Sequence, residues 1–316
     1  MNEQYNGIVQ DPRSDFEKSK DYKHEDLAQG DIVLVWKEYD ETFTPFPIQN
    51  QNGSSSCVSQ ATSKILAMHE VKEGRDYKQL CPKFIYDNRA NYPDKGMWLP
   101  NALEIACKSG TCLESLLPCD MQGEAYMNDK SLLTADMSNN ALQYRGKFYF
   151  EIKTRNIDEI AKVIEQGYGV LLGFRFDYDE WTDVPTINPN SRNSCGHGVA
   201  GTRYCLHNGE KAIMIEDSWG PHYGKGGTRL ITETFLNEKC FYAGYVTSLP
   251  NYTFTKTLRR GSRGLEVKML QEKLGITADG IFGKHTEQAV MDFQIRHNLV
   301  SDGIVGKCTN AVLNTI

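Results

Sequence analysis

The chain has 316 residues, of which 40% are hydrophobic and 24% charged, a composition typical of soluble globular proteins. Its 35 Lys and Arg against 41 Asp and Glu give a formal net charge of −6, which argues against a general binder of nucleic acid or of anionic membranes. No apolar run approaches the ~18–20 residues that cross a bilayer, and residues 1–20 lack the apolar core of a secretory signal.

The nine cysteines include no CxxC pair, which argues against zinc-ribbon and thioredoxin-like sites. Without a secretory signal we expect reduced thiols, most of them acting as small buried hydrophobic side chains. Because nine is an odd number, at least one thiol is free unless it pairs with another chain. We expect no metal cluster and no cofactor.

The N-terminal part of the chain divides into a polar segment and a predicted helix. Residues 1–29 are polar and charged and are interpreted as an extension rather than a domain, and apolar clusters begin at Ile32. Residues 57–70 follow the loop NGSSS and carry apolar side chains at helical spacing. This pattern predicts a helix with one apolar face.

The middle of the chain carries one further helix signal and then strands. Asn156 and Glu159 resemble a capping box for a helix over 157–166, which Gly167 would end. Five strand-like segments follow at 169–176, 197–205, 210–217, 228–232 and 241–246. Since helices come first and strands follow, we predict an α+β domain of two subdomains rather than alternating βα units.

One cysteine differs from the others in its position. Cys57 opens the helix over 57–70, where the helix dipole and unpaired N–H groups favour the thiolate, the nucleophilic form of the thiol. His197 and Asp217 supply a base and a group that orients it. The turn signal at 207–209 predicts a hairpin that brings these two residues to the same end. Because the two arms differ by roughly three residues, a bulge or a wider loop is also expected.

This arrangement resembles the papain family of cysteine peptidases over about residues 30–250. Gln51, six residues before Cys57, matches the family's oxyanion-hole glutamine, and His197 matches its base. Asp217, in the motif DSWG, stands where the family has asparagine. The resemblance implies amide hydrolysis by a Cys-His-Asp triad, in a fold with a helical half and an antiparallel β half.

Two further residues are candidate substrate contacts. Trp219 matches the family's tryptophan that shields the hydrogen bond between the base and its orienting group. Gly96 is open to two interpretations, a hydrogen-bond partner of the substrate backbone or a plain turn glycine. The chain departs from the family in Val58 after the nucleophile and in Ser54, where the family has a disulfide-forming cysteine. The family's inhibitory propeptide motif is not visible in residues 1–29.

Beyond residue 250 the pattern changes to a short internal repeat. The sequence DGIFGK at 279–284 returns as DGIVGK at 302–307, and each copy continues with a threonine, Thr286 or Thr309. A repeat of this kind marks a repeated structural unit. Each copy predicts a glycine turn followed by a helix that the threonine caps.

Residues 258–316 closely resemble the type 1 peptidoglycan-binding domain. The resemblance rests on a spaced pattern that includes Gly261, Gly264, Val267, Leu270-Gln271, Leu274, the two glycine turns, Ala289-Val290 and Phe293-Gln294. It implies a small three-helix domain that binds peptidoglycan, with residues 251–257 as a linker. The apolar positions are interpreted as core, and Asp279 and Asp302 as turn formers.

Together the two resemblances imply a cysteine endopeptidase targeted to the bacterial cell wall. The leading hypothesis is a lysin of phage or bacterial origin that cuts peptide stems or cross-bridges. Its expected partners are peptidoglycan and a peptide or protein substrate. Two alternatives stay open, a general protein endopeptidase anchored to the wall and a non-catalytic wall-binding scaffold. The lack of a secretory signal fits synthesis in the cytoplasm, with action at the wall after release or as part of a phage particle.

Overall fold

The computed structural model describes residues 7–19, 21–26, 32–248 and 253–315. The chain forms two compact units that divide between Ser248 and Leu249, and the larger unit takes in most of the N-terminal segment. Among the described residues, every helix is too short or too polar to cross a membrane.

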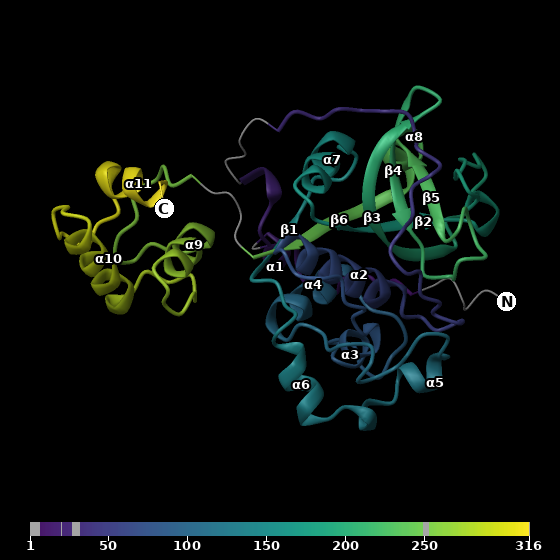
Figure 1. The fold of residues 1–316 in the computed structure, drawn as a ribbon, viewed down its shortest axis with the longest axis horizontal. Coiled ribbons are helices and arrows are strands. Elements are labelled where there is room, and N and C mark those ends of the chain that lie inside the picture. The colour runs from purple at the N-terminus through teal and green to yellow at the C-terminus, as the bar shows by residue number, and fades with distance from the viewer. Residues whose placement is uncertain (1–6, 20, 27–31, 249–252, 316) are drawn as a thin grey trace. The chain divides into compact units, whose positions relative to one another are not determined.

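The first half of the larger unit is built from helices around a buried core (Figure 1). The helices are α1 (Asp15–Lys18), α2 (Cys57–Lys72), α3 (Pro82–Asp87), α4 (Leu99–Lys108), α5 (Glu124–Met127) and α6 (Ala135–Ala141). Helix α2 begins where the sequence predicts it. It is buried on almost every side from Cys57 to Glu70, rather than on one apolar face. Its small polar side chains are satisfied locally, as when Thr62 Oγ1 donates to the Val58 carbonyl at 2.7 Å.

The second half is a six-stranded sheet in which every neighbouring pair is antiparallel, in the order β1-β6-β2-β3-β4-β5. The strands are β1 (Phe148–Glu151), β2 (Val170–Phe176), β3 (Cys195–His207), β4 (Glu210–Glu216), β5 (Thr228–Thr232) and β6 (Cys240–Thr247). Strands β2 to β6 lie within two residues of the predicted segments. Strand β1 was not predicted, because four residues are too few to establish an alternating pattern. The α+β prediction is confirmed.

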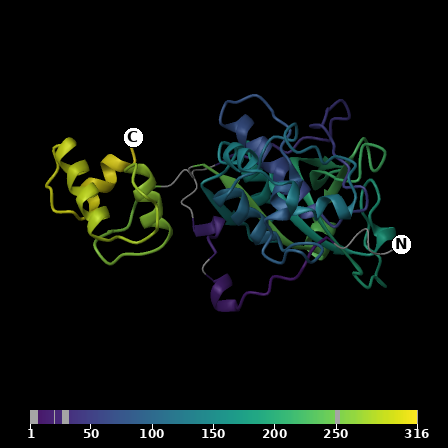
Figure 2. The same cartoon turned by 90° about the horizontal axis from the view of Figure 1, so that it is seen from below.

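The helical half covers one part of the sheet. In Figure 2 its blue helices lie in front of the green strands, and α2 packs on β3 while α4 packs on β6. A buried ion pair joins the two halves, since Lys64 Nζ of α2 lies 2.9 Å from Glu216 Oε2 of β4. Helices α7 (Ile157–Glu165) and α8 (Glu233–Lys239) also pack on the strands.

The N-terminus of α7 is capped by one half of the predicted capping box. Asn156 Oδ1 accepts from the Glu159 N–H at 3.2 Å. The Glu159 carboxylate instead pairs with Lys162 at 2.7 Å and lies 3.3 Å from His24. Gly167, with a φ of 92°, follows the end of the helix as predicted.

The β3–β4 hairpin carries the geometry on which the site depends. It turns at Asn208-Gly209, where both residues have positive φ, 53° and 81°. The pairing register shifts by one residue between Gly201 and Arg203, so the predicted bulge is present. The bulge removes part of the difference in arm length between His197 and Asp217, and the Asp217 side chain spans the rest.

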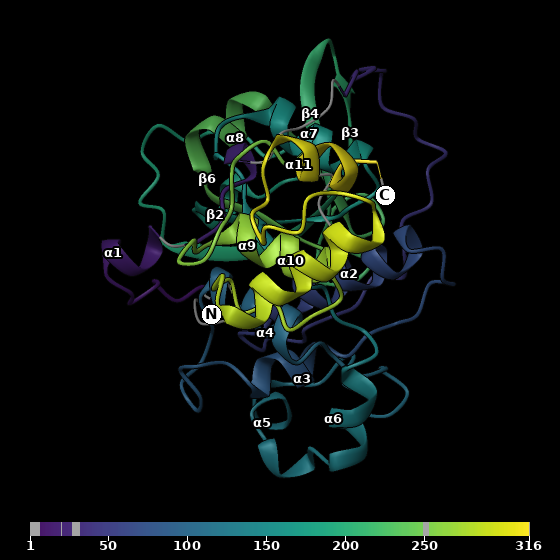
Figure 3. The same cartoon turned by 90° about the vertical axis from the view of Figure 1, so that its left-hand side faces the viewer.

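The smaller unit is a three-helix domain, as predicted, with α9 (Leu265–Lys273), α10 (Lys284–Arg296) and α11 (Lys307–Leu313) (Figure 3). Residues at its N-terminal end, expected as a linker, are held to α11. Phe254 is buried, its N–H donates to Asn314 Oδ1 at 2.7 Å, and its carbonyl accepts from Asn314 Nδ2 at 2.9 Å. Residues 251–252 of the expected linker lie outside the described residues.

The first copy of the internal repeat closes around a buried glutamine. Gln271 Nε2 lies 2.7 Å from Asp279 Oδ1, 3.1 Å from the Ile281 carbonyl and 2.9 Å from Thr286 Oγ1. Its Oε1 accepts from the Gly280 N–H at 2.8 Å. The glutamine therefore ties α9 to the turn and to the first turn of α10.

The second copy repeats this network, 23 residues later, around Gln294. Its partners are Asp302 Oδ1 at 2.9 Å, the Ile304 carbonyl at 2.9 Å, Thr309 Oγ1 at 3.1 Å and the Gly303 N–H at 2.9 Å. The predicted threonine caps are wrong, because the N-cap residues are Gly283 and Gly306. Thr286 and Thr309 lie inside the helices, and their hydroxyls serve the glutamine network instead.

Replacing Gln294 with methionine tests the importance of this network. The substitution keeps the volume of the side chain but leaves buried partners of Gln294 without a hydrogen bond, at a cost of about 2–3 kcal/mol. We expect the free energy of unfolding of the smaller unit to fall by that amount, measured by urea-dependent hydrogen exchange of the α10 amides. Gln288→Met, at an exposed position on the same helix, is the matched control. Equal effects of the two substitutions would contradict the assignment.

Candidate active site

Cys57 is the first residue of α2, and no side chain caps that turn of the helix. The thiol is fully buried, and the Gly198 N–H points at its Sγ at 3.4 Å. Its position at a helix N-terminus places it next to the positive end of the helix dipole. The helix dipole and the Gly198 N–H place positive partial charge next to the sulfur.

His197 and Asp217 meet beside this thiol, as the sequence predicts. His197 lies near the start of β3 and Asp217 directly follows β4, and His197 Nε2 lies 2.7 Å from Asp217 Oδ1. The imidazole lies close enough to Cys57 for the thiol to raise the pKa of His197. The three side chains therefore form a continuous row, in the order in which a nucleophile, a base and an orienting group are needed.

His197 and Asp217 each stabilise the charged form of the other. Burial on its own would lower the pKa of His197, but the Asp217 carboxylate and the contact with Cys57 raise it above its usual value. Burial on its own would raise the pKa of Asp217, but His197 and Arg229 lower it. An imidazolium next to a carboxylate is therefore the stable form of the pair at neutral pH.

Two residues that sequence reasoning missed complete the site. Arg229 Nε donates to Asp217 Oδ2 at 2.9 Å, and Trp181 Nε1 donates to the same oxygen at 3.0 Å. The Ser218 N–H donates to Oδ1 at 2.8 Å. An asparagine amide nitrogen at this position would face two donors, so the surroundings require a carboxylate. The only sequence signal was a charged residue inside the apolar strand TRLIT.

Gln51 is fixed next to Asp217. Its Oε1 accepts from Ser218 Oγ at 2.6 Å, and its backbone N–H donates to the Ser218 carbonyl at 2.8 Å. Its Nε2 donates to the Ser54 carbonyl at 2.5 Å. The structure therefore orients this amide, while its role at an oxyanion stays a prediction.

The two candidate substrate contacts occupy different surroundings. The Trp219 ring lies 4.9 Å from the His197 ring, measured between centroids, and covers that residue. The Gly96 N–H donates to Tyr86 Oη at 2.9 Å, so this group serves the helical half. The next residue, Met97, presents both its N–H and its carbonyl to the N-terminal segment. A substrate backbone is therefore expected to pair with Met97 rather than with Gly96.

The N-terminal segment lies directly on Cys57. The Gly7 N–H donates to the Gly196 carbonyl at 3.2 Å, and the Gly7 carbonyl accepts from Met97 at 3.0 Å. Ile8 pairs with Met97 in parallel and is buried. A Cβ atom added to Gly7 would lie 2.3 Å from Cys57 Sγ. The Gly7 carbonyl accepts a hydrogen bond from the Met97 N–H and does not face Cys57 Sγ for attack. The segment therefore covers the thiol without acting as a substrate at that carbonyl.

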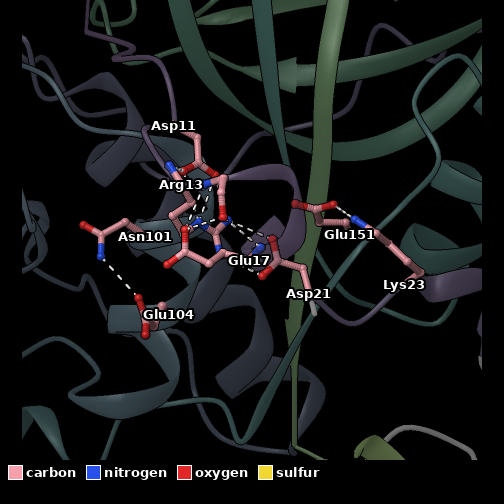
Figure 4. A network of polar contacts seen from close by, with 9 residues as sticks. Asp11, Arg13, Glu17, Asp21, Lys23, Asn101, Glu104 and Glu151 are labelled. Atoms are coloured by element: carbon pink, nitrogen blue, oxygen red, sulfur yellow. Dashed lines mark hydrogen bonds and ion pairs between the residues drawn. The ribbon is translucent and has the colours of Figure 1, made fainter. Parts of the chain in front are cut away.

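Ion pairs hold the segment that follows (Figure 4). Arg13 lies between two carboxylates, 2.7 Å from Asp11 Oδ2 and 2.8 Å from Asp21 Oδ2. Lys23 pairs with Glu151 of strand β1. The Arg13 pairs join residues of the N-terminal segment to one another across α1, and the Lys23–Glu151 pair joins the segment to strand β1.

The larger unit has the papain-like cysteine protease fold. Xylellain, a cysteine protease from Xylella fastidiosa, matches with a TM-score of 0.65 at 17% identity, over 79% of this chain and 98% of that chain. Digestive procathepsin L2 proteinase from Tenebrio molitor larval midgut gives 0.59 at 18%, over 78% and 79%. Bromelain protease from Ananas comosus gives 0.53 at 16%, over 64% and 94%. At these identities the likeness establishes the fold.

The smaller unit matches a known family by sequence. Residues 263–313 match the family described as a putative peptidoglycan binding domain. The prediction of a papain-like unit followed by a peptidoglycan-binding domain is therefore confirmed.

Proposed function

We propose that this chain, a papain-like fold followed by a peptidoglycan-binding domain, is a cysteine endopeptidase that hydrolyses peptide bonds in the bacterial cell wall. The observation that carries the proposal is the row formed by Cys57, His197 and Asp217. A fold alone does not establish an activity, but a nucleophile, a base and an orienting carboxylate in contact are what amide hydrolysis needs.

The reaction follows from the positions of these groups. Cys57 Sγ attacks the amide carbonyl, and the Gln51 amide and the Cys57 N–H stabilise the oxyanion, a contribution often worth ~3–4 kcal/mol for one donor. His197 gives its proton to the leaving amine, and the acyl group stays on the sulfur as a thioester. His197 then takes a proton from water as the water oxygen attacks the thioester carbonyl; the C–S bond breaks, the acid leaves, and the Cys57 thiolate and protonated His197 are restored. Asp217 keeps the imidazole oriented and stabilises its cation.

The C-terminal domain is the reason to propose a wall substrate. A binding domain raises the local concentration of enzyme on its polymer when the connecting chain spans the two sites. We propose that the bonds cut are in peptide stems or cross-bridges, as in a lysin of phage or bacterial origin. Its place of action would be the wall, reached after release from the cell or as part of a phage particle.

The test compares two substrates and two variants. The first variant is Gly7→Val, whose added side chain would clash with Cys57 Sγ and so displace the N-terminal segment. The second combines Gly7→Val with Cys57→Ala. Both variants and the full chain are incubated with purified sacculi and with denatured casein. New amine ends are identified by mass spectrometry. Release of muropeptides that depends on Cys57, with little cleavage of casein, supports the proposal. Cleavage of casein with intact sacculi would favour the alternative, a protein endopeptidase docked on the wall. No products from either substrate would favour a non-catalytic scaffold.

A further inference from the structure

Three buried thiols and one carboxylate gather in the helical half, away from the catalytic row. Cys81 precedes α3, while Cys112, Glu114 and Cys119 lie in the loop after α4. All three cysteines are fully buried, and Glu114 is partly buried. The sequence shows no CxxC pair because the fold joins residues 38 positions apart, Cys81 and Cys119.

The distances in this cluster are those of metal ligands. Cys81 Sγ lies 3.5 Å from Cys119 Sγ, and Cys119 Sγ lies 3.3 Å from Glu114 Oε2. These donor atoms of Cys81, Glu114 and Cys119 all lie within 4.8 Å of one another. Around a tetrahedral zinc ion, with Zn–S of ~2.3 Å and Zn–O of ~2.0 Å, the S···S and S···O separations are about 3.8 and 3.5 Å. The two printed separations that include Cys119 Sγ lie within a few tenths of an ångström of these values.

The carboxylate is held in the orientation that a ligand requires. Glu114 Oε1 accepts from the N–H groups of Cys119 at 2.6 Å and Asp120 at 2.9 Å, so Oε2 is left facing the thiols. Outer hydrogen bonds of this kind orient the ligands of metal sites. The Leu117 carbonyl lies 3.2 Å from Cys81 Sγ, whereas Cys112 falls outside the group whose donor atoms all lie within 4.8 Å of one another.

A disulfide between Cys81 and Cys119 explains these contacts less well. It would close the sulfurs to about 2.05 Å and remove the thiol proton that Glu114 Oε2 accepts. It would also leave the carboxylate facing sulfur atoms that cannot donate a hydrogen bond, which is costly in a buried site. A cation uses both the carboxylate and the thiols.

We propose that Cys81, Cys119 and Glu114 bind a zinc ion. The thiols release their protons to solvent when the ion binds. Since its thiols are fully buried, we assign the site a structural rather than a catalytic role. It replaces the expectation that the chain has no metal cluster.

The site would fasten the loop that supports Gln51. Asp120 Oδ1 accepts from the Asn50 N–H at 2.7 Å, and the Met121 N–H donates to the Asn50 carbonyl at 2.9 Å. Asn52 Nδ2 donates to the Met121 carbonyl at 2.7 Å. Residues on both sides of Gln51 therefore rest on the two residues that follow Cys119.

The experiment measures metal directly in the full chain. It uses the Cys57→Ala background, so that the thiol beside His197 contributes no signal. We expect about one zinc per chain by elemental mass spectrometry after purification in reducing buffer and removal of loose metal. Replacement of zinc by cobalt(II) is expected to give sulfur-to-metal charge-transfer absorption and the strong visible bands of a tetrahedral site.

Variants identify the ligands. Cys81→Ser, Cys119→Ser and Glu114→Gln are each expected to weaken cobalt binding at least ~10-fold, whereas Cys205→Ser, at another buried thiol, leaves it unchanged. If the serine variants do not fold, Glu114→Gln and the cobalt spectrum of the unchanged cluster decide the question. The proposal is overturned by a chain without zinc or cobalt bands, by metal binding that survives the variants, or by a Cys81–Cys119 disulfide in the purified protein.

Discussion

Gly7→Val is expected to raise kcat/KM for a peptide substrate roughly 10²-fold. Gly7 does not adopt a positive φ, so the substitution is opposed by space alone. Its new Cβ would lie 2.3 Å from Cys57 Sγ and 2.8 Å from the Ser55 carbonyl, distances that no packing tolerates. The segment must therefore move away from Cys57, which exposes the thiol.

The size of the effect follows from the contacts that hold the segment. Burial of Ile8 contributes about 2 kcal/mol, and the backbone bonds with Met97 and Gly196 add about 1 kcal/mol each before ordering costs. A net of about 3 kcal/mol corresponds to a closed state that is roughly 10²-fold favoured. The variant removes that advantage while every catalytic side chain is kept.

Two measurements check this prediction together. The first is kcat/KM at neutral pH, and the second is the rate at which iodoacetamide labels Cys57, resolved by mass spectrometry of its peptide. Both are expected to rise in Gly7→Val. Gln10→Ala, at an exposed position in the same segment, is the control and is expected to change neither. If Cys57 is labelled equally fast in the full chain and in Gly7→Val, the segment does not cover the thiol in solution.

The covering segment illustrates what the sequence could not predict. Residues 7–10 contain two adjacent apolar side chains, Ile8 and Val9, and no motif. Their position beside Cys57 depends on a strand-like pairing of Ile8 with Met97. A pairing between residues so far apart in the chain leaves no local pattern in the sequence. For the same reason the sequence did not single out Met97, since residue type does not reveal which backbone groups pair with a neighbouring segment.

The proximity of Cys57, His197 and Asp217 was predictable because its signals are local. Cys57 opens a helix with a clear pattern, and the turn at 208–209 aligns the two strands that carry His197 and Asp217. Arg229 and Trp181 were missed because each reaches Asp217 across the fold. The repeat of the smaller unit is also a local signal. The sequence predicted that its threonines cap the helices, whereas in the structure their hydroxyls accept hydrogen bonds from buried glutamines.

Asp217→Asn is expected to lower kcat/KM roughly 10²- to 10⁴-fold in the Gly7→Val background. Asparagine suits related folds, but here its amide nitrogen would face the donors of Arg229 and Trp181. If the amide turned its nitrogen toward His197 instead, the ring would lose the acceptor that lies 2.7 Å from its Nε2. The charge of Arg229, which is also buried, would lose its partner, so the free energy of unfolding is expected to fall by about 3–5 kcal/mol.

The pH profile gives this prediction its sign. The carboxylate of Asp217 raises the pKa of His197. The protonated imidazole, which gives its proton to the leaving amine, is therefore present at pH values below that pKa and is lost as the pH rises through it. Removing the negative charge lowers the pKa of His197. The alkaline limb of kcat/KM is therefore expected to move to lower pH, by ~1–3 units.

A second substitution separates stability from catalysis. Asp217→Asn combined with Arg229→Met removes the stranded charge, so part of the lost stability should return while the pH profile stays shifted. Glu41→Gln, which breaks the exposed pair with Lys225, is the control and should alter neither property. If Asp217→Asn keeps the alkaline limb of the parent, the carboxylate does not set the charge of His197. Asp217 would then be needed only as the partner of the buried Arg229 charge.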